Sequence, residues 1–449
     1  MIRKSPTCCL EITTRVRRWC VLGSLLLGCL STEAAIPVTD SPVAHWNEMA
    51  LDSIRATATP PPKASRILAM LHVAIHDAYN GVRGTYEQYQ VPAPKWVEDV
   101  SGRAALAAAA SDILGNAFPD RVALFQAEEA RQLRWGRRAK GRRAGIRWGA
   151  YVAQAVIAAR SNDGASTSVV HVPEVGPGEW VSTPPAFASG LLPQWGAVQP
   201  FGIASAQSFL PMPPPPLDGT VYAEEVEQVR VLGAAASFVR TPDQTQVARF
   251  WANGAGTATP PGHWNQIARQ VLALRPMGLG EEARLMALLN VALADAAIVC
   301  WKAKYEYTLW RPITAIREAD TDGNPLTIGE PGWAPLLNTP PFPEYTSGHS
   351  TFSGAGAAVL ARAFGTDSIP FVGESDDVPG IQRPFAGFWH AAEESGMSRI
   401  YGGIHFMSAN VNGLESGRAI ALSVTGNLLR PVAACDGDED DIPEGDEVD

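Results

Sequence analysis

A lysine and an arginine stand seven residues apart near the middle of the carboxyl-terminal half. They are Lys304 and Arg311, and Pro312 follows directly. In an unbroken helix this spacing covers about two turns, so it predicts both side chains on nearly one face. Two long cations on one face suit a shared anion. The ordinary alternative is a pair of surface side chains that keep their charged heads in water.

A second segment runs from Pro343 to Ser350 and contains serine, glycine and histidine in sequence. Ser347 or Thr346 is a suitable helix N-cap, which places the amides of Gly348 and His349 at the helix start. Unpaired amides and the helix dipole favour an anion there, and the small residues that follow allow another helix to pack closely. The alternative is an ordinary capped helix with a hydrogen-bonded histidine.

A third segment carries another arginine and another histidine, Arg399 and His405. An unbroken helix would place them on different faces, but Gly402-Gly403 between them permits a bend that turns both inward. The three segments together supply three cations, an anion-binding helix start and two histidines. These groups suit the binding of a tetrahedral oxyanion and the transfer of a group to or from it.

The order and spacing of these residues resemble the three-part signature of the vanadium-dependent haloperoxidase and type-2 phosphatidic acid phosphatase superfamily. The flanking runs Trp-Lys-Ala-Lys-Tyr, Pro-Glu-Tyr and Ile-Tyr-Gly-Gly-Ile-His resemble its secreted bacterial haloperoxidase-like branch. The similarity extends from about His45 to Leu429. One departure is Thr346, where the family usually has proline. The lost backbone constraint is expected to loosen the loop without removing any ligand.

The resemblance implies an oxyanion site made of cations and a helix start. The residues that would neutralise the equatorial oxygens of vanadate or phosphate are Lys304, Arg311, Ser347, Gly348 and Arg399. Lys304 also counts among the expected catalytic residues. The implied cofactor is vanadate in a haloperoxidase, whereas a phosphatase of this superfamily needs none.

Two histidines and two aromatic residues complete the implied site. His405 would be the vanadium ligand in a peroxidase, or the nucleophile that forms a phosphohistidine in a phosphatase, and His349 would be the general acid and base. Trp301 and Phe342 stand where fungal-type chloroperoxidases also have Trp and Phe. This implies an apolar wall on the halide side, with simple core packing as the alternative.

The resemblance leaves two activities open, because vanadate adopts the five-coordinate geometry that phosphate reaches only in transit. The leading hypothesis is a haloperoxidase-like oxidoreductase that oxidises halide with hydrogen peroxide at a vanadate centre. The alternative is a soluble acid phosphatase, a hydrolase of phosphomonoesters. The expected partners are therefore small molecules: hydrogen peroxide, halide and an organic acceptor, or a phosphate ester. The complete set of site residues argues against a non-catalytic scaffold.

The elements that must position these residues are predicted to be helices. The strongest helical periodicity runs from 281 to 310, and Pro312 is expected to end it. Further helices are predicted at 64–79, 103–117, 121–132, 143–160, 222–236, 243–252, 264–273, 351–364, 385–396 and 413–429. Strand signals are scarce. The sequence therefore predicts an all-α fold, helical bundles with long irregular Pro/Gly-rich connections.

Composition divides the chain into four predicted regions. Residues 36–220 form an amino-terminal helical region that ends in a wrapping loop rich in Pro, Gly and Ser. Residues 221–432 form a carboxyl-terminal helical bundle that carries the vanadate or phosphate site. Residues 433–449 are predicted to be a disordered acidic tail.

The first region, residues 1–35, has the layout of a signal peptide. Arginines precede a short apolar run from Cys20 to Leu30, and small residues follow. The run is too short to span a membrane, so export to the periplasm or the medium is expected. Lipoprotein anchoring at Cys29 is the alternative. No later run reaches 18 apolar residues, which predicts no integral membrane segment in the mature chain.

Overall composition is that of a globular protein, with 46% hydrophobic and 18% charged residues. The net charge of −10 comes mostly from the acidic tail, and no basic surface suggests binding to nucleic acid. Four of the six cysteines lie in the leader, so neither a disulfide framework nor a zinc site is expected. Assembly into a homo-oligomer stays open.

Two weaker candidates have plain structural interpretations. His72 and His76 lie four residues apart beside Asp77, a spacing that suits a metal on a helix, but no third ligand follows at a defined offset. Helix packing is the favoured role. The run from Asp320 to Asn324 resembles a calcium loop but lacks the glutamate at its twelfth position, so a polar turn is favoured.

Overall fold

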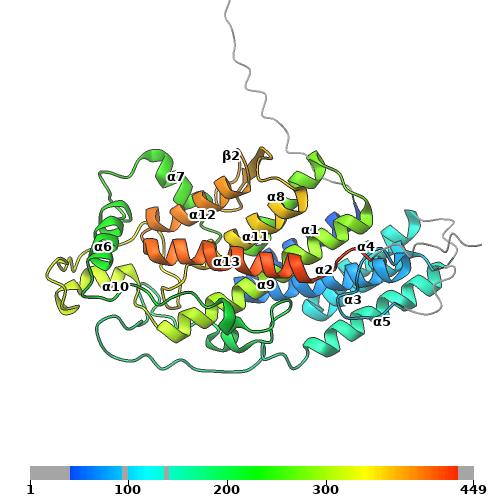
Figure 1. Cartoon of the computed structure of the whole chain (residues 1–449), viewed down its shortest axis with the longest axis horizontal. Helices are drawn as coiled ribbons and strands as arrows, with labels where there is room; N and C mark the ends of the chain where they lie inside the picture. The colour runs from blue at the N-terminus through cyan, green and yellow to red at the C-terminus, as the bar shows by residue number, and fades with distance from the viewer. Residues whose placement is uncertain (1–40, 94–99, 136–140, 433–449) are drawn as a thin grey trace, which may run out of the picture. The chain divides into compact units, whose positions relative to one another are not determined.

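The long apolar helix expected around residue 290 is present as α9 (Leu279–Tyr307) and forms the centre of the core (Figure 1). The computed structural model describes residues 41–93, 100–135 and 141–432. Residues 285–301 are all buried, because apolar side chains occur around the whole helix. Among the described residues α9 alone is long and apolar enough to cross a membrane, yet 94% of its apolar window is buried inside the protein. Packing accounts for its composition.

Helices from both predicted regions surround α9 and share one core. Among the α-helices, those that pack most extensively against it are α2 (Pro61–Arg83), α8 (Thr259–Leu274), α11 (Gly348–Phe364) and α13 (Met407–Asn427). Figure 1 shows α9 beside α2 and the red-orange α13. In the described chain the region 36–220 therefore packs on the region 221–432, and their division into separate domains stays a prediction.

The amino-terminal helices form a layer in which α3 packs between α2 and α5. They are α1 (Pro42–Ala56), α3 (Gly102–Ala117), η1 (Pro119–Arg121), α4 (Val122–Trp135) and α5 (Arg142–Arg160). Sequence periodicity did not predict α1. Its signals were nevertheless present, because the Ser41 hydroxyl accepts a hydrogen bond from the Ala44 amide and Pro42 occupies the first turn.

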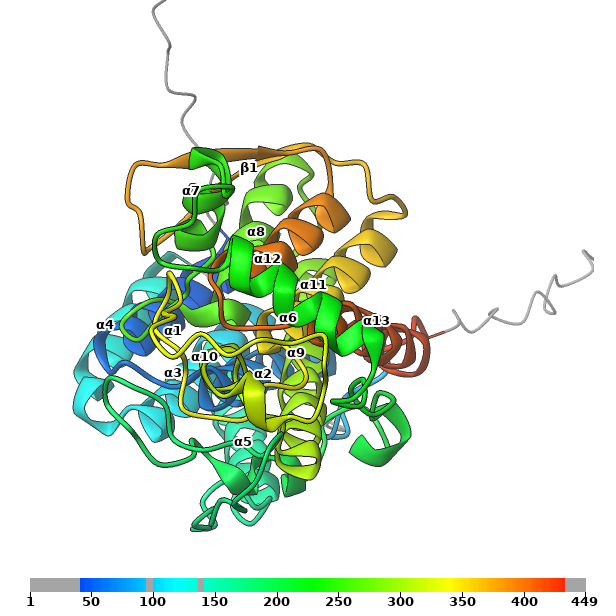
Figure 2. The same cartoon turned by 90° about the vertical axis from the view of Figure 1, so that its left-hand side faces the viewer.

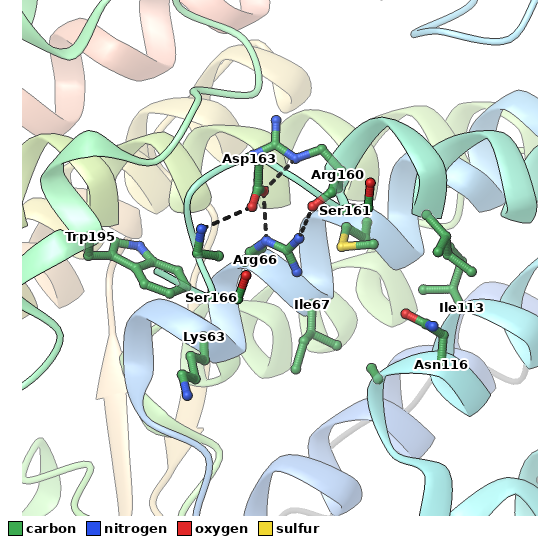
Figure 3. A pocket seen from close by; sticks show the side chains of 14 residues that line it. Lys63, Arg66, Ile67, Ile113, Asn116, Arg160, Ser161, Asp163, Ser166 and Trp195 are labelled. Atoms are coloured by element: carbon green, nitrogen blue, oxygen red, sulfur yellow. Dashed lines mark hydrogen bonds and ion pairs between the residues drawn. The ribbon is translucent and has the colours of Figure 1, made fainter. Parts of the chain in front are cut away.

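The predicted long connection after α5 is held by buried charges rather than by regular structure. It contains only two short 3-10 turns among its described residues, η2 (Pro193–Ala197) and η3 (Ala206–Phe209). At its start Asp163 accepts hydrogen bonds from Arg66 of α2 and Arg160 of α5 (Figure 3). These three side chains line a cavity of about 420 Å³ and neutralise one another in part.

The remaining elements close the carboxyl-terminal half. They are α6 (Thr220–Leu232), α7 (Pro242–Phe250), α10 (Pro312–Arg317), η4 (Ala319–Thr321), β1 (Phe371–Glu374), β2 (Gln382–Phe385) and α12 (Phe388–Tyr401). The antiparallel pair β1 and β2 lies beside α7 (Figures 1 and 2), where Phe385 packs on Phe250. The all-α prediction is confirmed, since this two-stranded hairpin is the one sheet in the described residues. The leader and the acidic tail lie outside the described residues.

Glycine allows α11 and α13 to approach closely, as the small residues after Ser347 predicted. A Cβ added at Gly417 of α13 would lie 2.1 Å from the Thr351 carbonyl oxygen of α11. Nearer the α13 start, a Cβ at Gly413 would lie 3.0 Å from the Ser347 carbonyl oxygen. The close packing of α13 therefore helps to set the position of the first turn of α11.

Replacing Gly417 by alanine should destabilise the protein by about 1 to 3 kcal/mol, because the added methyl group must push α11 and α13 apart. Gly426→Ala on the same helix is the matched control, since no atom lies within 4 Å of its added Cβ. That change should be neutral or stabilising by up to about 1 kcal/mol. Chemical denaturation measures the free energy of unfolding of both variants. A Gly417→Ala protein as stable as the parent would contradict the packing described.

Candidate active site

Three segments far apart in the sequence meet beside the core: the end of α9, the loop before α11 and the turn after α12. The Lys304 ammonium at the end of α9 donates to the Thr346 carbonyl oxygen at 2.5 Å. The Arg311 guanidinium donates to the Ile404 carbonyl oxygen at 2.7 Å. The three motifs predicted from the sequence therefore form one site.

The expectation that Lys304 and Arg311 share one helix face is wrong. Helix α9 ends at Tyr307, and Thr308 follows in the left-handed region with φ of 43°. Arg311 has extended backbone and precedes α10, whose first residue is Pro312. The proline therefore starts the next helix rather than ending the first, a position where its missing N–H costs nothing. Both cations are nevertheless fully buried.

Lys304 holds the loop before α11 in place. Its ammonium donates to the carbonyl oxygens of Pro343, Glu344 and Thr346, at 3.0, 3.0 and 2.5 Å. A lysine ammonium has three hydrogens, and these contacts use all of them. Lys304 therefore acts on the site through its positive charge rather than through a direct hydrogen bond. Burial lowers the pKa of Lys304 to about 7, with the nearby Arg311 charge acting in the same direction.

The same contacts bear on the expected loosening at Thr346. This residue is buried, and its carbonyl oxygen accepts from Lys304 and the Cys300 thiol. Its hydroxyl lies 3.4 Å from that of Thr351 in the first turn of α11. Thr346 is thus held on both sides, so hydrogen bonds supply part of the constraint that proline supplies in the family.

The two arginines are anchored to backbone carbonyl groups and retain unused donors. Arg311 donates through Nε to Phe342 and through Nη1 to Ile404, while its Nη2 is buried without a partner. Arg399 donates through Nη1 to the Trp251 carbonyl oxygen at 2.5 Å, and its Nε is buried without a partner. Burial lowers the pKa of both guanidinium groups, to about 10 for Arg311 and about 9 for Arg399.

His405 is buried between Arg311 and a carboxylate. Its Nε2 lies 3.1 Å from Arg311 Nη1, and its Nδ1 lies 2.8 Å from Glu344 Oε1. Burial holds the pKa of His405 well below its usual range, and the charges of the three site cations lower it further. The ring is therefore neutral near neutral pH, which is the form that a metal ligand or a nucleophile requires.

The start of α11 contributes Ser347, Gly348 and His349, as predicted. The Ser347 hydroxyl caps the helix by accepting from the Ser350 amide, and Gly348 is the first helical residue. His349 is half-buried, and its Nε2 atom is buried without a partner. Burial holds the pKa of His349 well below its usual range and the Arg399 charge adds to this effect, so this ring is also neutral.

A glycine bend turns the third motif inward, as expected. Helix α12 ends at Tyr401, and Gly403 has φ of +76°. A Cβ there would lie 2.4 Å from the Gly233 carbonyl oxygen, so glycine is required both for the conformation and for the close approach. Arg399 and His405 consequently reach the same site, and the Arg399 charge lowers the pKa of His405.

Trp301 and Phe342 form an aromatic wall against the cations. Their ring centroids are 5.0 Å apart. The centre of the Phe342 ring lies 4.8 Å from Lys304 Nζ and 4.8 Å from the Arg311 guanidinium carbon. A cation over an aromatic face is a favourable contact. Phe342 is half-buried while Trp301 is buried, so the wall packs on the core and also borders the site.

Buried polar atoms without a hydrogen-bond partner show that an oxyanion fits this site. Such atoms are uncommon in folded proteins, because burying them unpaired is unfavourable. Here they include Arg311 Nη2, Arg399 Nε and His349 Nε2. The two arginine atoms are permanent donors, and the histidine nitrogen donates when protonated. A tetrahedral anion offers an oxygen acceptor to each of them.

Comparison with known proteins agrees with this geometry. Residues 284–433 match the model of the VCPO second helical-bundle domain. The vanadium chloroperoxidase of Curvularia inaequalis is 29% identical over 501 aligned residues, which cover 84% of this chain and 81% of the relative. The structure of a bacterial vanadium-dependent iodoperoxidase matches with a TM-score of 0.77 at 28% identity, covering 87% of this chain and 97% of that one.

The family model and these two relatives support the vanadium haloperoxidase superfamily. A bacterial vanadium-dependent chloroperoxidase in its holo form also matches, with a TM-score of 0.65 at 16% identity over 82% of this chain and 93% of that chain, a likeness that shows the shared fold alone. The resemblance drawn from the three motifs is confirmed.

The site includes residues that the motifs did not assign. Trp251 follows α7, supplies the carbonyl oxygen that anchors Arg399 and stacks on His263 with ring centroids 4.4 Å apart. Glu344 lies inside the second motif and contacts His405. Because Trp251 acts through its backbone carbonyl oxygen, its residue type does not indicate this role. The glutamate in an otherwise buried run was a signal that sequence reasoning could have used.

The two weaker candidates have structural roles. In α2, His72 and His76 are buried and pair with the Asn47 side chain and the Glu87 carbonyl oxygen. Asp77 accepts from three backbone amides of the following loop. Within the described ranges no group of three or more His, Cys, Asp or Glu side chains suits a metal ion.

The run from Asp320 to Asn324 is a polar turn. Asp320 accepts from the Gly329 amide, and Asp322 accepts from the Asn324 amide and the Thr327 hydroxyl. These carboxylates are therefore used within the turn itself. The calcium-loop alternative finds no support in their contacts.

Proposed function

We propose that this protein is a vanadium-dependent haloperoxidase-like enzyme that oxidises halide with hydrogen peroxide. The observation that carries the proposal is the neutral, buried His405 next to arginines whose unused donors fit an oxyanion. The vanadium haloperoxidase relatives support vanadate as that oxyanion. Three buried cations otherwise lack a compensating anionic charge of equal size, and a bound oxyanion would supply it.

Each side chain has a defined task in this proposal. Bound vanadate would supply an electrophilic centre that activates peroxide towards halide. Arg311 and Arg399 would bind its oxygens through their unpartnered nitrogens, and Lys304 would add charge through the loop that it anchors. His405 would hold the vanadate through Nε2. His349 would accept and return a proton at its own Nε2, because that atom is unpartnered.

The aromatic wall would favour the chemistry by excluding water. Trp301 and Phe342 present apolar surface next to the cations. A halide beside such a surface loses part of its hydration and becomes more reactive. Bromide or iodide is the proposed halide, since both shed water more readily than chloride. An organic acceptor for the oxidised halogen is part of the same proposal.

Anion affinity should fall as the pH rises above about 7. Burial lowers the pKa of Lys304 to about 7, so above that pH the free site loses the ammonium charge and binding must recover a proton. Burial also raises the pKa of Glu344 to about 7, so ionisation of its carboxyl acts in the same direction. Sulfate is the suitable probe, because its own charge is constant over this range.

Calorimetric titration with sulfate in two buffers of different ionisation enthalpy measures this proton uptake. We expect affinity to fall by up to about tenfold per pH unit and per proton above pH 7, and to level off below it. Lys304→Met should bind more weakly and show a shallower dependence. Equal sulfate affinity at pH 6 and pH 9 would contradict the assignment.

The experiment that tests the function compares two activities in one preparation. Purified protein, stripped of metal and anions, is assayed for bromide and iodide oxidation with peroxide and increasing orthovanadate, and for hydrolysis of p-nitrophenyl phosphate. The proposal expects halide oxidation that saturates with vanadate. Ester hydrolysis that vanadate merely inhibits, with no halide oxidised at any pH, would establish the phosphatase alternative instead.

Export is a further part of the proposal. Residues 1–35 would be removed as a signal peptide, which would place the mature enzyme in the periplasm or the medium. The mass of the mature amino-terminal peptide after expression in a bacterial host tests this directly. A protein that retains the Arg15 to Arg18 segment would contradict it, and a lipid-modified Cys29 would establish the anchored alternative.

A further inference from the structure

Glu344 is a completely buried carboxylate for which the resemblance gives no role. It lies between Phe342 of the aromatic wall and Ser347 at the start of α11. Its Oε1 accepts two hydrogen bonds of 2.8 Å, one from His405 Nδ1 and one from the Phe406 amide. Its Oε2 has no partner. Both hydrogen bonds of this carboxylate are therefore directed to His405 and its neighbour.

The contacts of the His405 ring fix which nitrogen carries the proton. Arginine has only donors, so Nε2, which lies 3.1 Å from Arg311 Nη1, must present its lone pair. A neutral imidazole carries one N–H, which must then be on Nδ1. That N–H points to Glu344 Oε1, the acceptor it needs. The two contacts are consistent with one tautomer and with no other.

This arrangement also fixes the plane of the ring. Because the same oxygen binds the His405 ring and the Phe406 backbone, a rotation of the ring would break one bond while the other holds the carboxylate. The loop that carries Glu344 is in turn held by Lys304, which donates to the Glu344 carbonyl oxygen. Glu344 therefore connects the first, second and third motifs at the ring whose other nitrogen, Nε2, would face the oxyanion.

We infer that Glu344 is the positioning residue of His405: its carboxylate keeps the proton on Nδ1 and aims the Nε2 lone pair at the oxyanion. This inference rests on the proposed function, since it concerns the ligand that His405 offers to vanadate. Nε2 would thus offer a lone pair to vanadate while the proton is held on Nδ1 by Glu344. Partners of this kind typically contribute about 10-fold to 100-fold to metal affinity.

Two anions separate positioning from a general structural role. Orthovanadate would gain a bond to Nε2, whereas sulfate would be held by the cations and hydrogen bonds alone. Loss of positioning should weaken vanadate binding and spare sulfate binding, because removing a carboxylate does not reduce the positive charge of the site. Collapse of the site would instead weaken the binding of both vanadate and sulfate.

The experiment uses three variants of the full chain. Glu344→Leu removes the acceptor. Glu344→Gln retains an acceptor of the same shape, and it keeps the test informative where the leucine variant fails to fold. Glu225→Gln is the matched control: Glu225 is a partly buried carboxylate, which accepts hydrogen bonds from the amide and hydroxyl of Ser408, three residues after His405. Circular dichroism and thermal unfolding establish that each variant is folded.

The first readout is the His405 tautomer in the anion-free protein. Long-range proton–nitrogen spectra of protein labelled at its eight histidines distinguish protonated from unprotonated ring nitrogens. The wild type, Glu344→Gln and Glu225→Gln should show the proton on Nδ1. Glu344→Leu should show a smaller share of this state, because the acceptor of the Nδ1 proton is lost and Arg311 alone then favours it. The His405→Gln spectrum assigns the signal.

The second readout is the ratio of vanadate to sulfate affinity, measured by calorimetry. We expect Glu344→Leu to lower the vanadate affinity by at least about tenfold, with sulfate affinity unchanged or increased. Glu344→Gln should keep both affinities within about tenfold of the wild type. The inference would be overturned if Glu344→Leu changed neither the tautomer nor the vanadate affinity. It would also be overturned if a folded Glu344→Gln protein lost affinity for vanadate and sulfate to the same extent.

The two proposals fail in different ways. A wild-type protein that binds vanadate no more tightly than sulfate would contradict the proposed function, even with the proton on Nδ1. A wild-type protein that binds vanadate tightly, and keeps this affinity and tautomer without Glu344, would leave the function intact and remove the positioning role.

Discussion

Replacing His405 by alanine is expected to abolish turnover, with a loss of more than about a thousandfold. The side chain offers a neutral, buried nitrogen whose orientation is fixed by Glu344 and Arg311 and whose lone pair is available. Its removal takes away the axial ligand of a peroxidase and equally the nucleophile of a phosphatase. The cations remain, so sulfate binding should persist within about tenfold.

His390→Ala is the control for this change, because His390 is an exposed histidine of α12. Its loss should leave halide oxidation and vanadate affinity unchanged. Steady-state bromide and iodide oxidation at saturating vanadate measures both variants. Measurable turnover in His405→Ala at more than a tenth of the parent rate would contradict the assigned role.

Replacing His349 by alanine should slow turnover by roughly a hundredfold or more while leaving anion binding largely intact. His349 is at the start of α11, and its Nε2 is unpartnered. A group in that position suits proton transfer. The Ser347 cap and the helix-start amides do not depend on the histidine side chain, so the anion keeps most of its contacts.

The contrast between kcat and binding distinguishes the two histidines. His349→Ala should lower kcat and flatten the pH profile of the rate, with vanadate affinity within about tenfold of the parent. His405→Ala should lower vanadate affinity itself. An unchanged rate in His349→Ala, or a vanadate affinity that falls as far as in His405→Ala, would show that the proton-transfer role is wrong.

The residues of the site could be predicted because the motifs place unusual residue types at fixed intervals. The cations, the serine cap and His405 are buried together, and the half-buried His349 lies close enough to affect the pKa of His405, as the resemblance implied. The bend at Gly402-Gly403 was predictable for a local reason, since glycine permits a conformation that other residues avoid. The helical class followed from periodicity in the same local way.

What could not be predicted depends on contacts between distant parts of the chain. The end of α9 at Tyr307 was missed because Pro312 is compatible with both the end of one helix and the start of the next. Glu344 pairs with a residue 61 positions away, and no local pattern reports that distance. The Trp251 carbonyl oxygen that anchors Arg399 is invisible in side-chain chemistry.

The most direct test of the account is a crystal structure of the protein grown with orthovanadate. The account predicts vanadate with one axial bond to His405 Nε2, its oxygens contacting Arg311 and Arg399, and Glu344 still bonded to His405 Nδ1. Vanadate bound only elsewhere, for example in the cavity beside Arg66 and Lys63 (Figure 3), with His405 still paired to Arg311, would contradict the central claim.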